Sequence, residues 1–236
     1  MASTAGTPSI QIDPNVRGDS ADEARQHALD RILESGAIAV IRMADSERLL
    51  RVIDAVRAGG VTAIEVTMTT PDALEVIARV AQAGSGVEIG VGSVLDADTA
   101  RRAIDAGARY VVSPIFKPEI IRAAHERGVP VMPGAFSPTE IQAAWEAGAD
   151  VVKVFPADAF GMAYFKAVLA PMPHLRLMPT GGVTLDNAGD WIRAGACAVG
   201  VGSALLDKRA IADGNFDKLT ENARTLRRSV EEGRSG

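Results

Sequence analysis

Apolar residues occur in eight short runs along the chain, and segments with helical periodicity separate them. The runs cover 37–42, 63–68, 88–93, 110–114, 129–134, 151–156, 176–182 and 198–203. Between them, apolar residues recur every three or four positions, as in 46–60, 96–107, 118–128, 137–148 and 185–195. This alternation predicts eight strands, each followed by a helix.

Glycine closes the predicted helices at regular intervals. Gly59, Gly107, Gly128, Gly148 and Gly195 stand where a helix gives way to a strand, the usual place of a glycine cap. Nearly continuous apolar strands indicate parallel strands covered by helices on their outer face. We therefore predict a (β/α)8 TIM barrel. The alternative, a doubly wound open sheet, would require a glycine-rich turn after the first strand, and residues 41–45 contain no glycine.

The two ends of the chain extend this pattern. Ser20 and Glu23 have the spacing of a capping box and predict an extra N-terminal helix through about Glu34. Residues 1–22 are small, polar and turn-rich, and we expect a disordered tail there, followed by a single barrel domain over 23–236. Residues 208–232 predict one final amphipathic helix.

Composition limits the partners and the compartment. The 236 residues carry a net charge of −5 at pH 7, so general binding to nucleic acid or to an anionic membrane is not expected. A single cysteine excludes an intramolecular disulfide framework and a cysteine-cluster metal site. No apolar run has the length of a membrane-spanning helix, and residues 1–22 lack the apolar core of a secretory signal. We expect a soluble cytoplasmic protein.

Functional residues of such a barrel lie at the carboxyl ends of its strands and on the loops that follow. Applied to the eight runs, this rule selects Arg42, Glu65, Thr67, Thr69, Ser93, Pro114, Lys153, Phe155, Thr180, Gly181, Gly182, Gly202 and Ser203. No histidine lies at a predicted strand end, and Glu65 is the only clear acidic group there. We therefore expect neither a metal nor another cofactor.

Lys153 is one of only five lysines among 25 basic residues, and it lies inside an apolar run. Strand alternation places it on the same face as Val151 and Phe155. A lysine directed into a barrel is partly withdrawn from water, which favours the neutral amine that a Schiff-base nucleophile requires. The alternatives are a strand-end lysine that extends to solvent and a buried ion pair with Glu65.

Glu65 is the lone charge in another apolar run, on the same face as Thr67 and Thr69. Burial raises the pKa of a carboxyl group and suits it to proton transfer near neutral pH. The alternative is a structural ion pair with Lys153 or Arg42.

Glycine-rich turns follow the last two predicted strands, at Thr180-Gly181-Gly182 and Gly202-Ser203. Backbone N–H groups in the loops after strands seven and eight form the recurrent phosphate site of this fold. Together the two turns predict that the ligand carries a phosphate group.

These residues resemble those of the 2-keto-3-deoxy-6-phosphogluconate (KDPG) and 4-hydroxy-2-oxoglutarate (KHG) aldolases. The resemblance runs from about residue 30 to 206. Its motifs are Gly59-Gly60-Val61, Ile64-Glu65-Val66-Thr67, Gly92-Ser93-Val94, Val112-Ser113-Pro114, Met132-Pro133-Gly134, Ser137-Pro138-Thr139-Glu140, Val152-Lys153-Val154-Phe155-Pro156-Ala157, Pro179-Thr180-Gly181-Gly182-Val183 and Val199-Gly200-Val201-Gly202-Ser203.

The resemblance implies a class I aldolase, a lyase that releases pyruvate from a phosphorylated keto-deoxy acid. Lys153 would form a Schiff base with the substrate carbonyl, and Glu65 would transfer protons. Phe155 and Pro114 would line the pyruvyl pocket, and the two glycine turns would bind the phosphate. The family is usually a homotrimer.

Ser93, Thr69 and the turn Ile115-Phe116-Lys117 after Pro114, which is bulkier than usual, depart from the family pattern. Ser93 stands where a threonine is usual, and Thr69 stands where many relatives have an arginine that binds the pyruvate carboxylate. Arg42 is the expected substitute cation, as in a subset of relatives. These changes leave open the substrate, which could be KDPG, KHG, a phosphogalactonate-type acid or an unphosphorylated acid. A phosphate-binding isomerase or synthase and a catalytically inactive assembly subunit are the alternatives outside this chemistry.

Overall fold

A computed structural model of the protein describes residues 20–43 and 45–236. The first nineteen residues of the predicted tail lie outside this part of the chain, and Ala21 and Asp22 are already helical. The strands are β1 (Ala37–Ile41), β2 (Ala63–Thr67), β3 (Glu88–Gly92), β4 (Val111–Val112), β5 (Val131–Met132), β6 (Gly134–Ala135), β7 (Val152–Val154), β8 (Leu177–Pro179) and β9 (Val199–Val201).

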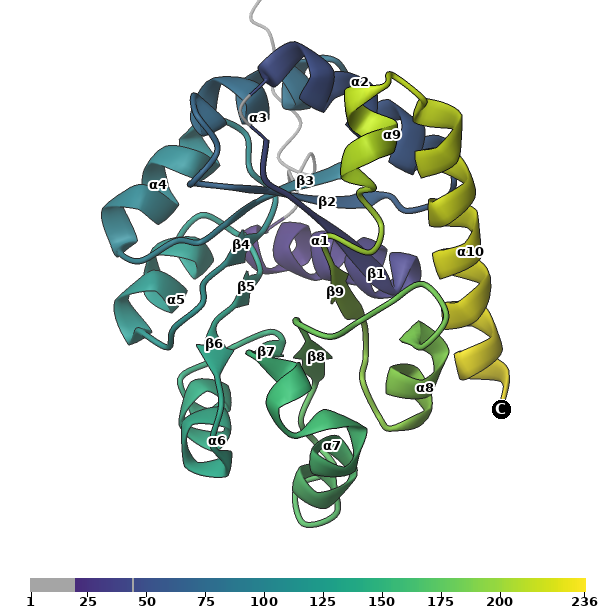
Figure 1. Ribbon diagram of the computed structural model, residues 1–236. Helices are drawn as coiled ribbons and strands as arrows, with labels where there is room; N and C mark the ends of the chain where they lie inside the picture. Colours follow the sequence, from purple (N-terminus) through teal and green to yellow (C-terminus); the bar gives the residue numbers. More distant parts are fainter. Residues whose placement is uncertain (1–19, 44) are drawn as a thin grey trace, which may run out of the picture.

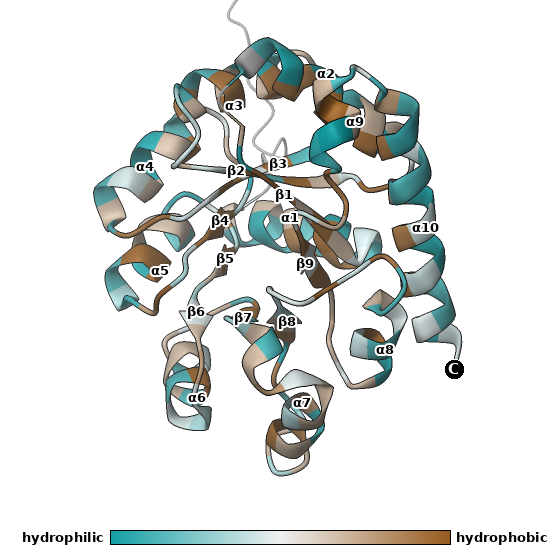
Figure 2. Ribbon diagram, in the orientation of Figure 1, coloured by the Kyte–Doolittle hydropathy of each residue, from teal (hydrophilic) through white to brown (hydrophobic). Residues whose placement is uncertain are grey.

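Helices surround these strands (Figure 1). They are α1 (Ala21–Ser35), α2 (Ser46–Ala58), α3 (Ala73–Gln82), α4 (Ala97–Asp105), α5 (Pro118–His125), α6 (Pro138–Glu146), the 3-10 turn η1 (Ala157–Ala159), α7 (Gly161–Leu169), α8 (Ala188–Arg193), α9 (Lys208–Ala212) and α10 (Phe216–Ser235). In Figure 2 the strands are mainly hydrophobic, whereas the helices carry hydrophilic stretches.

The strands form a closed ring in which every pairing is parallel. One sheet has the order β5-β4-β3-β2-β1-β9, and a second has the order β6-β7-β8. β5 and β6 are two parts of the fifth predicted strand, divided at Pro133, and they pair with β4 and β7 respectively. Isolated bridges, Leu177 with Ala196 and Thr180 with Gly200, join β8 to β9. The structure thus confirms the barrel and excludes the doubly wound open sheet.

The N-terminal helix α1 closes the amino end of the barrel. The capping box at Ser20 and Glu23 is formed as the sequence predicts. Leu29 and Ile32 of α1 belong to the same apolar cluster as the interior residues Ile38 and Tyr110. Burial of these large side chains stabilises α1 against the ends of the strands.

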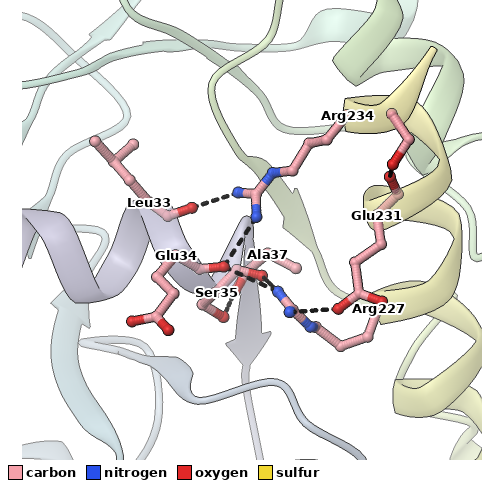
Figure 3. A network of polar contacts seen from close by, with 8 residues as sticks. Leu33, Glu34, Ser35, Ala37, Arg227, Glu231 and Arg234 are labelled. Carbon is pink, nitrogen blue, oxygen red and sulfur yellow. Dashed lines mark hydrogen bonds and ion pairs between the residues drawn. The ribbon is translucent and has the colours of Figure 1, made fainter.

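The C-terminal helix α10 holds α1 in place (Figure 3). Arg227 donates hydrogen bonds to the backbone oxygens of Glu34 and Ser35, and Arg234 donates to those of Leu33 and Glu34. Arg227 also pairs with Glu231 at 2.7 Å, one turn further along α10. These carbonyl groups lie at the end of α1, where no further helical turn supplies N–H donors.

The prediction of one helix over 208–232 is wrong, because the chain turns between α9 and α10. Gly214 adopts a φ of 71°, which favours glycine, and it follows the end of α9. Asn215 then caps α10 by accepting a hydrogen bond from the N–H of Lys218. Within the described residues, no helix combines the length and the apolar character needed to cross a membrane.

Candidate active site

Eleven of the thirteen predicted residues lie at or just beyond the carboxyl ends of the barrel strands, and Glu65 and Lys153 are the central residues of their strands. Glu65 and Thr67 lie in β2 and Lys153 in β7; Arg42 follows β1, Thr69 follows β2, Ser93 follows β3, Pro114 follows β4, Phe155 follows β7, Thr180, Gly181 and Gly182 follow β8, and Gly202 and Ser203 follow β9. The barrel therefore brings to one end residues that are far apart in the sequence.

Lys153 is the central residue of β7, and only 6% of its surface is exposed. It lies between Gly134 of β6 and Met178 of β8 in the parallel register. Its Nζ atom lies 5.3 Å from the centre of the Phe155 ring, close enough for a cation–π contact. The side chain therefore does not extend freely into solvent, which was one of the alternatives for this lysine.

Gly134 allows the chain around Lys153 to pack tightly. A Cβ atom at this position would overlap the carbonyl group of Pro114. The loop after β4 therefore lies directly against β6, beside the strand that carries Lys153. Glycine at position 134 is required by this close approach of two backbones.

Glu65 is 1% exposed in β2 and lies over Gly92 of the neighbouring strand β3. Any Cβ atom at position 92 would overlap its carboxylate, so the glycine provides the space that the carboxylate occupies. Burial raises the pKa of Glu65, and the positive charges of Lys153 and Arg42 oppose this effect only in part. Burial therefore favours the protonated form of Glu65 more than it would be favoured in an exposed glutamate.

The predicted alternative, a structural ion pair of Glu65 with Lys153 or Arg42, is not formed. Among the ion pairs between described residues, none within 4.0 Å involves Glu65. The two cations influence Glu65 from a greater distance.

Hydroxyl groups surround the carboxyl end of β2. The Oγ1 atoms of Thr67 and Thr69 lie 2.9 Å apart, and that of Thr70 is 3.5 Å from Thr67. Thr67 is buried, whereas Thr69 is exposed. Ser93, the residue after β3, is half-buried. Its φ of 59° is uncommon for a residue other than glycine. Such strained conformations occur frequently at binding sites.

The two glycine turns have different surroundings. Gly181 and Gly182 both have positive φ values, and they pack against Asp158 of η1. Gly202 and Ser203 line a cavity of about 440 Å3 with Arg42. The second turn therefore lies beside a cation, and the first lies beside a carboxylate.

Some residues of this region were not predicted from the sequence. Val40, Met43, Leu206, Lys208 and Ile211 complete the lining of the cavity. The rarity of lysine in the chain, which singled out Lys153, also applies to Lys208. The prediction of one amphipathic helix over 208–232 places it on the surface instead.

Tyr110 was also not predicted. It is fully buried, and its ring covers Gly90, two residues before the glycine that accommodates Glu65. Burial, with a smaller effect from Glu65 and Glu88, raises the pKa of Tyr110 well above its usual value, so its hydroxyl stays protonated.

Comparison with protein families identifies the chain. The profile described as KDPG and KHG aldolase matches residues 29–222. The chain belongs to this aldolase family. It is therefore an enzyme of the lyase class, as the sequence predicts.

Similar proteins from this aldolase family include two kinds of named enzyme. The chain is 38% identical to a 2-dehydro-3-deoxy-phosphogluconate aldolase of Treponema pallidum (strain Nichols), covering 82% of this chain and 91% of the relative. It is also 38% identical to a probable 2-dehydro-3-deoxy-6-phosphogalactonate aldolase of Rhizobium meliloti (strain 1021), covering 75% and 86%.

Among solved structures, a KDPG aldolase of Legionella pneumophila has pyruvate captured as a covalent carbinolamine intermediate. It is 28% identical to this chain with a TM-score of 0.78, and the match covers 84% of this chain and 97% of that one.

Proposed function

We propose that this aldolase cleaves KDPG to pyruvate and glyceraldehyde 3-phosphate through a Schiff base on Lys153. The observation that carries the proposal is a buried lysine and a buried carboxyl group at the same end of one barrel, with the pKa of Glu65 raised by burial. The carbinolamine described for the Legionella pneumophila relative supports covalent chemistry of this kind.

The proposed reaction begins with attack of the neutral Lys153 amine on the C2 carbonyl carbon. Protonated Glu65 donates a proton to the carbinolamine hydroxyl, which leaves as water and produces the iminium ion. Ionised Glu65 then accepts the proton of the C4 hydroxyl. The electrons of the C3–C4 bond move into the iminium group, the aldehyde departs, and an enamine of pyruvate remains. Glu65 gives this proton to C3 of the enamine, which produces the iminium ion of pyruvate. Water then adds to the iminium carbon while Glu65 accepts a proton from it, and collapse of the carbinolamine releases pyruvate, the free amine and protonated Glu65.

The other site residues have proposed roles in binding. Thr67, Thr69 and Ser93 provide hydroxyl groups for the pyruvyl carboxylate, with Arg42 as the nearby positive charge. Pro114 and Phe155 provide apolar walls beside Lys153. Thr180 and the glycine turns at Gly181, Gly182, Gly202 and Ser203 provide the phosphate site.

A second candidate substrate is the phosphogalactonate-type acid, which differs in configuration at C4. The identity is 38% both to the probable phosphogalactonate aldolase and to the phosphogluconate aldolase, although the first match covers less of each chain, so identity does not decide between the substrates. A panel of KDPG, its galactonate epimer, their unphosphorylated forms and KHG distinguishes these substrates when pyruvate release is measured. We expect the highest kcat/KM with KDPG; higher values with the galactonate epimer would identify that acid as the substrate.

Covalent trapping tests the chemistry directly. Borohydride added with pyruvate is expected to label Lys153 irreversibly, as detected by peptide mass spectrometry. Lys153→Met should abolish labelling and reduce kcat by about 10⁴-fold or more, since it removes the nucleophile. Lys166→Met, on the exposed face of α7, is the matched control and should keep both properties. An unlabelled wild-type protein, or an active Lys153→Met variant, would contradict the proposal.

We also propose a cytoplasmic homotrimer. The trimer is usual in the family that the sequence resembles, and a single cysteine is compatible with a reducing compartment. Light scattering coupled to size-exclusion chromatography measures the first property, and cell fractionation measures the second.

A further inference from the structure

A cavity of about 440 Å3 lies between the ends of β1 and β9 and helix α9. Its lining combines apolar side chains with two cations. The lining residues are Val40, Arg42, Met43, Gly202, Ser203, Leu206, Lys208 and Ile211. A cavity with apolar walls and a few polar groups is typical of a small-molecule site, in which the polar groups determine specificity.

Neither cation of this cavity is neutralised by a carboxylate of the described chain. The ion pairs within 4.0 Å between described residues include neither Arg42 nor Lys208. The adjacent Asp207 is already engaged, because its carboxylate accepts a hydrogen bond of 2.9 Å from the N–H of Ala210. In a chain with a net charge of −5, two unpaired cations at one cavity indicate an anionic ligand.

The pairing of β1 with β2 places one wall of the cavity next to the proposed reaction centre. Val40, which lines the cavity, is the partner of Glu65 in the parallel pairing of β1 and β2. Partners on neighbouring strands are about 4.8 Å apart. A ligand bound beside Glu65 can therefore extend toward the carboxyl ends of β1 and β9. Arg42, Ser203 and Lys208 follow these strand ends.

We propose that Lys208 binds the phosphate group of the substrate and, together with Ser203, determines the preference for phosphorylated keto-deoxy acids. The inference rests on the proposed function. Lysine supplies a mobile point charge that attracts a phosphate dianion, and the side chains of Met43, Leu206 and Ile211 form the apolar part of the same cavity. The proposal adds a side-chain charge to a phosphate site otherwise made of backbone N–H groups and one hydroxyl.

Lys208→Gln tests this role, because it removes the charge but keeps most of the side-chain length. The selectivity of the variant, measured as kcat/KM for KDPG divided by kcat/KM for the unphosphorylated acid, should decrease about tenfold, since charge-assisted hydrogen bonds contribute roughly that factor. The loss should come from KM for KDPG. Lys208→Arg should restore most of the selectivity. The control is Arg209→Gln, which removes a neighbouring exposed charge that does not line the cavity and pairs with Asp213 instead.

Calorimetric binding of glycerol 3-phosphate supplies a readout that does not depend on catalysis. Its affinity should decrease about tenfold in Lys208→Gln and should be unchanged in Arg209→Gln. Equal affinities in wild type and Lys208→Gln, no binding by the wild type, or equal losses in both variants would overturn the role of Lys208. Failure of wild-type labelling by pyruvate and borohydride would instead overturn the aldolase mechanism.

Discussion

Glu65 and Glu88 are buried glutamates on neighbouring strands, and Glu88 lies nearer the amino end of the barrel. Glu65 is 1% exposed and Glu88 4%. Glu88 aligns with Ala63, and Glu65 follows two residues later along β2. Glu88 is 2.8 Å from Arg31 of α1 and 3.7 Å from Arg109, which precedes β4. Within the described chain Glu65 has no partner at such a distance, and its pKa is raised.

The difference between the two glutamates separates structural stabilisation from chemical function. A buried carboxylate that is paired with arginines holds together the elements that carry them, here α1, β3 and the segment before β4. A buried carboxyl group without a close cation destabilises the fold in its ionised form, and such groups are concentrated at functional sites. The comparison therefore predicts a structural role for Glu88 and a chemical role for Glu65.

Glu65→Gln and Glu88→Gln test this comparison most strongly. Glu65→Gln should lower kcat by about 10²–10⁴-fold because it removes proton transfer, and it should not lower the free energy of unfolding. Glu88→Gln should instead lower that free energy by about 1–2 kcal/mol, an amount limited by the exposure of both arginines, and should leave kcat within about twofold. Kinetics with KDPG and urea unfolding of both variants provide the measurements. Equal losses of activity and stability in Glu65→Gln would show that Glu65 is structural.

Gly92→Ala and Gly90→Ala, two substitutions in β3, test whether the position of the Glu65 carboxylate matters for activity. A Cβ atom at position 92 displaces the Glu65 carboxylate, whereas one at position 90 collides with the ring of Tyr110. Both variants should lose about 1–3 kcal/mol of stability by overpacking. Only Gly92→Ala should also lose most of its kcat, measured at a temperature where both variants are folded. Similar kcat values in the two variants would mean that the position of Glu65 does not limit the reaction.

The pH dependence of stability gives the smallest expected effect. Because the pKa of Glu65 is raised in the folded state, folding favours its protonated form, and this contribution to stability is lost as pH rises through the folded pKa. Glu65→Gln does not ionise, so its stability relative to the wild type should increase between about pH 5 and pH 8. Urea unfolding at both pH values measures the change. A constant difference would indicate that the pKa of Glu65 is the same in the folded and unfolded states.

The sequence predicts the barrel and most of the site because each depends on local patterns. Gly107, Gly128 and Gly148 mark the strand–helix period, and Lys153 and Glu65 are isolated charges in apolar runs. Glu88 begins an equally apolar run, yet only the tertiary structure brings Arg31 to it. Local pattern therefore detects a charge in an apolar strand but cannot determine whether a distant residue neutralises it.

The division of the fifth strand and the position of Lys208 could not be predicted from local patterns, because they depend on long-range pairing and on a turn. The division of the fifth strand at Pro133 follows from its two different neighbours, β4 and β7. Lys208 lines the cavity with Ser203 because the turn at Gly214 separates α9 from α10 and lets α9 lie beside the end of β9. Helical periodicity alone did not reveal the interruption, because the residues on both sides continue an amphipathic pattern.

The contact between α10 and α1 has a consequence for the order in which the chain folds during synthesis. Arg227 and Arg234 reach the end of α1 from positions 192 to 201 residues later in the sequence. These hydrogen bonds can therefore form only after the ribosome has synthesised α10, long after α1 has emerged. Until then the end of α1 lacks these donors, and the contact is one of the most non-local in the fold.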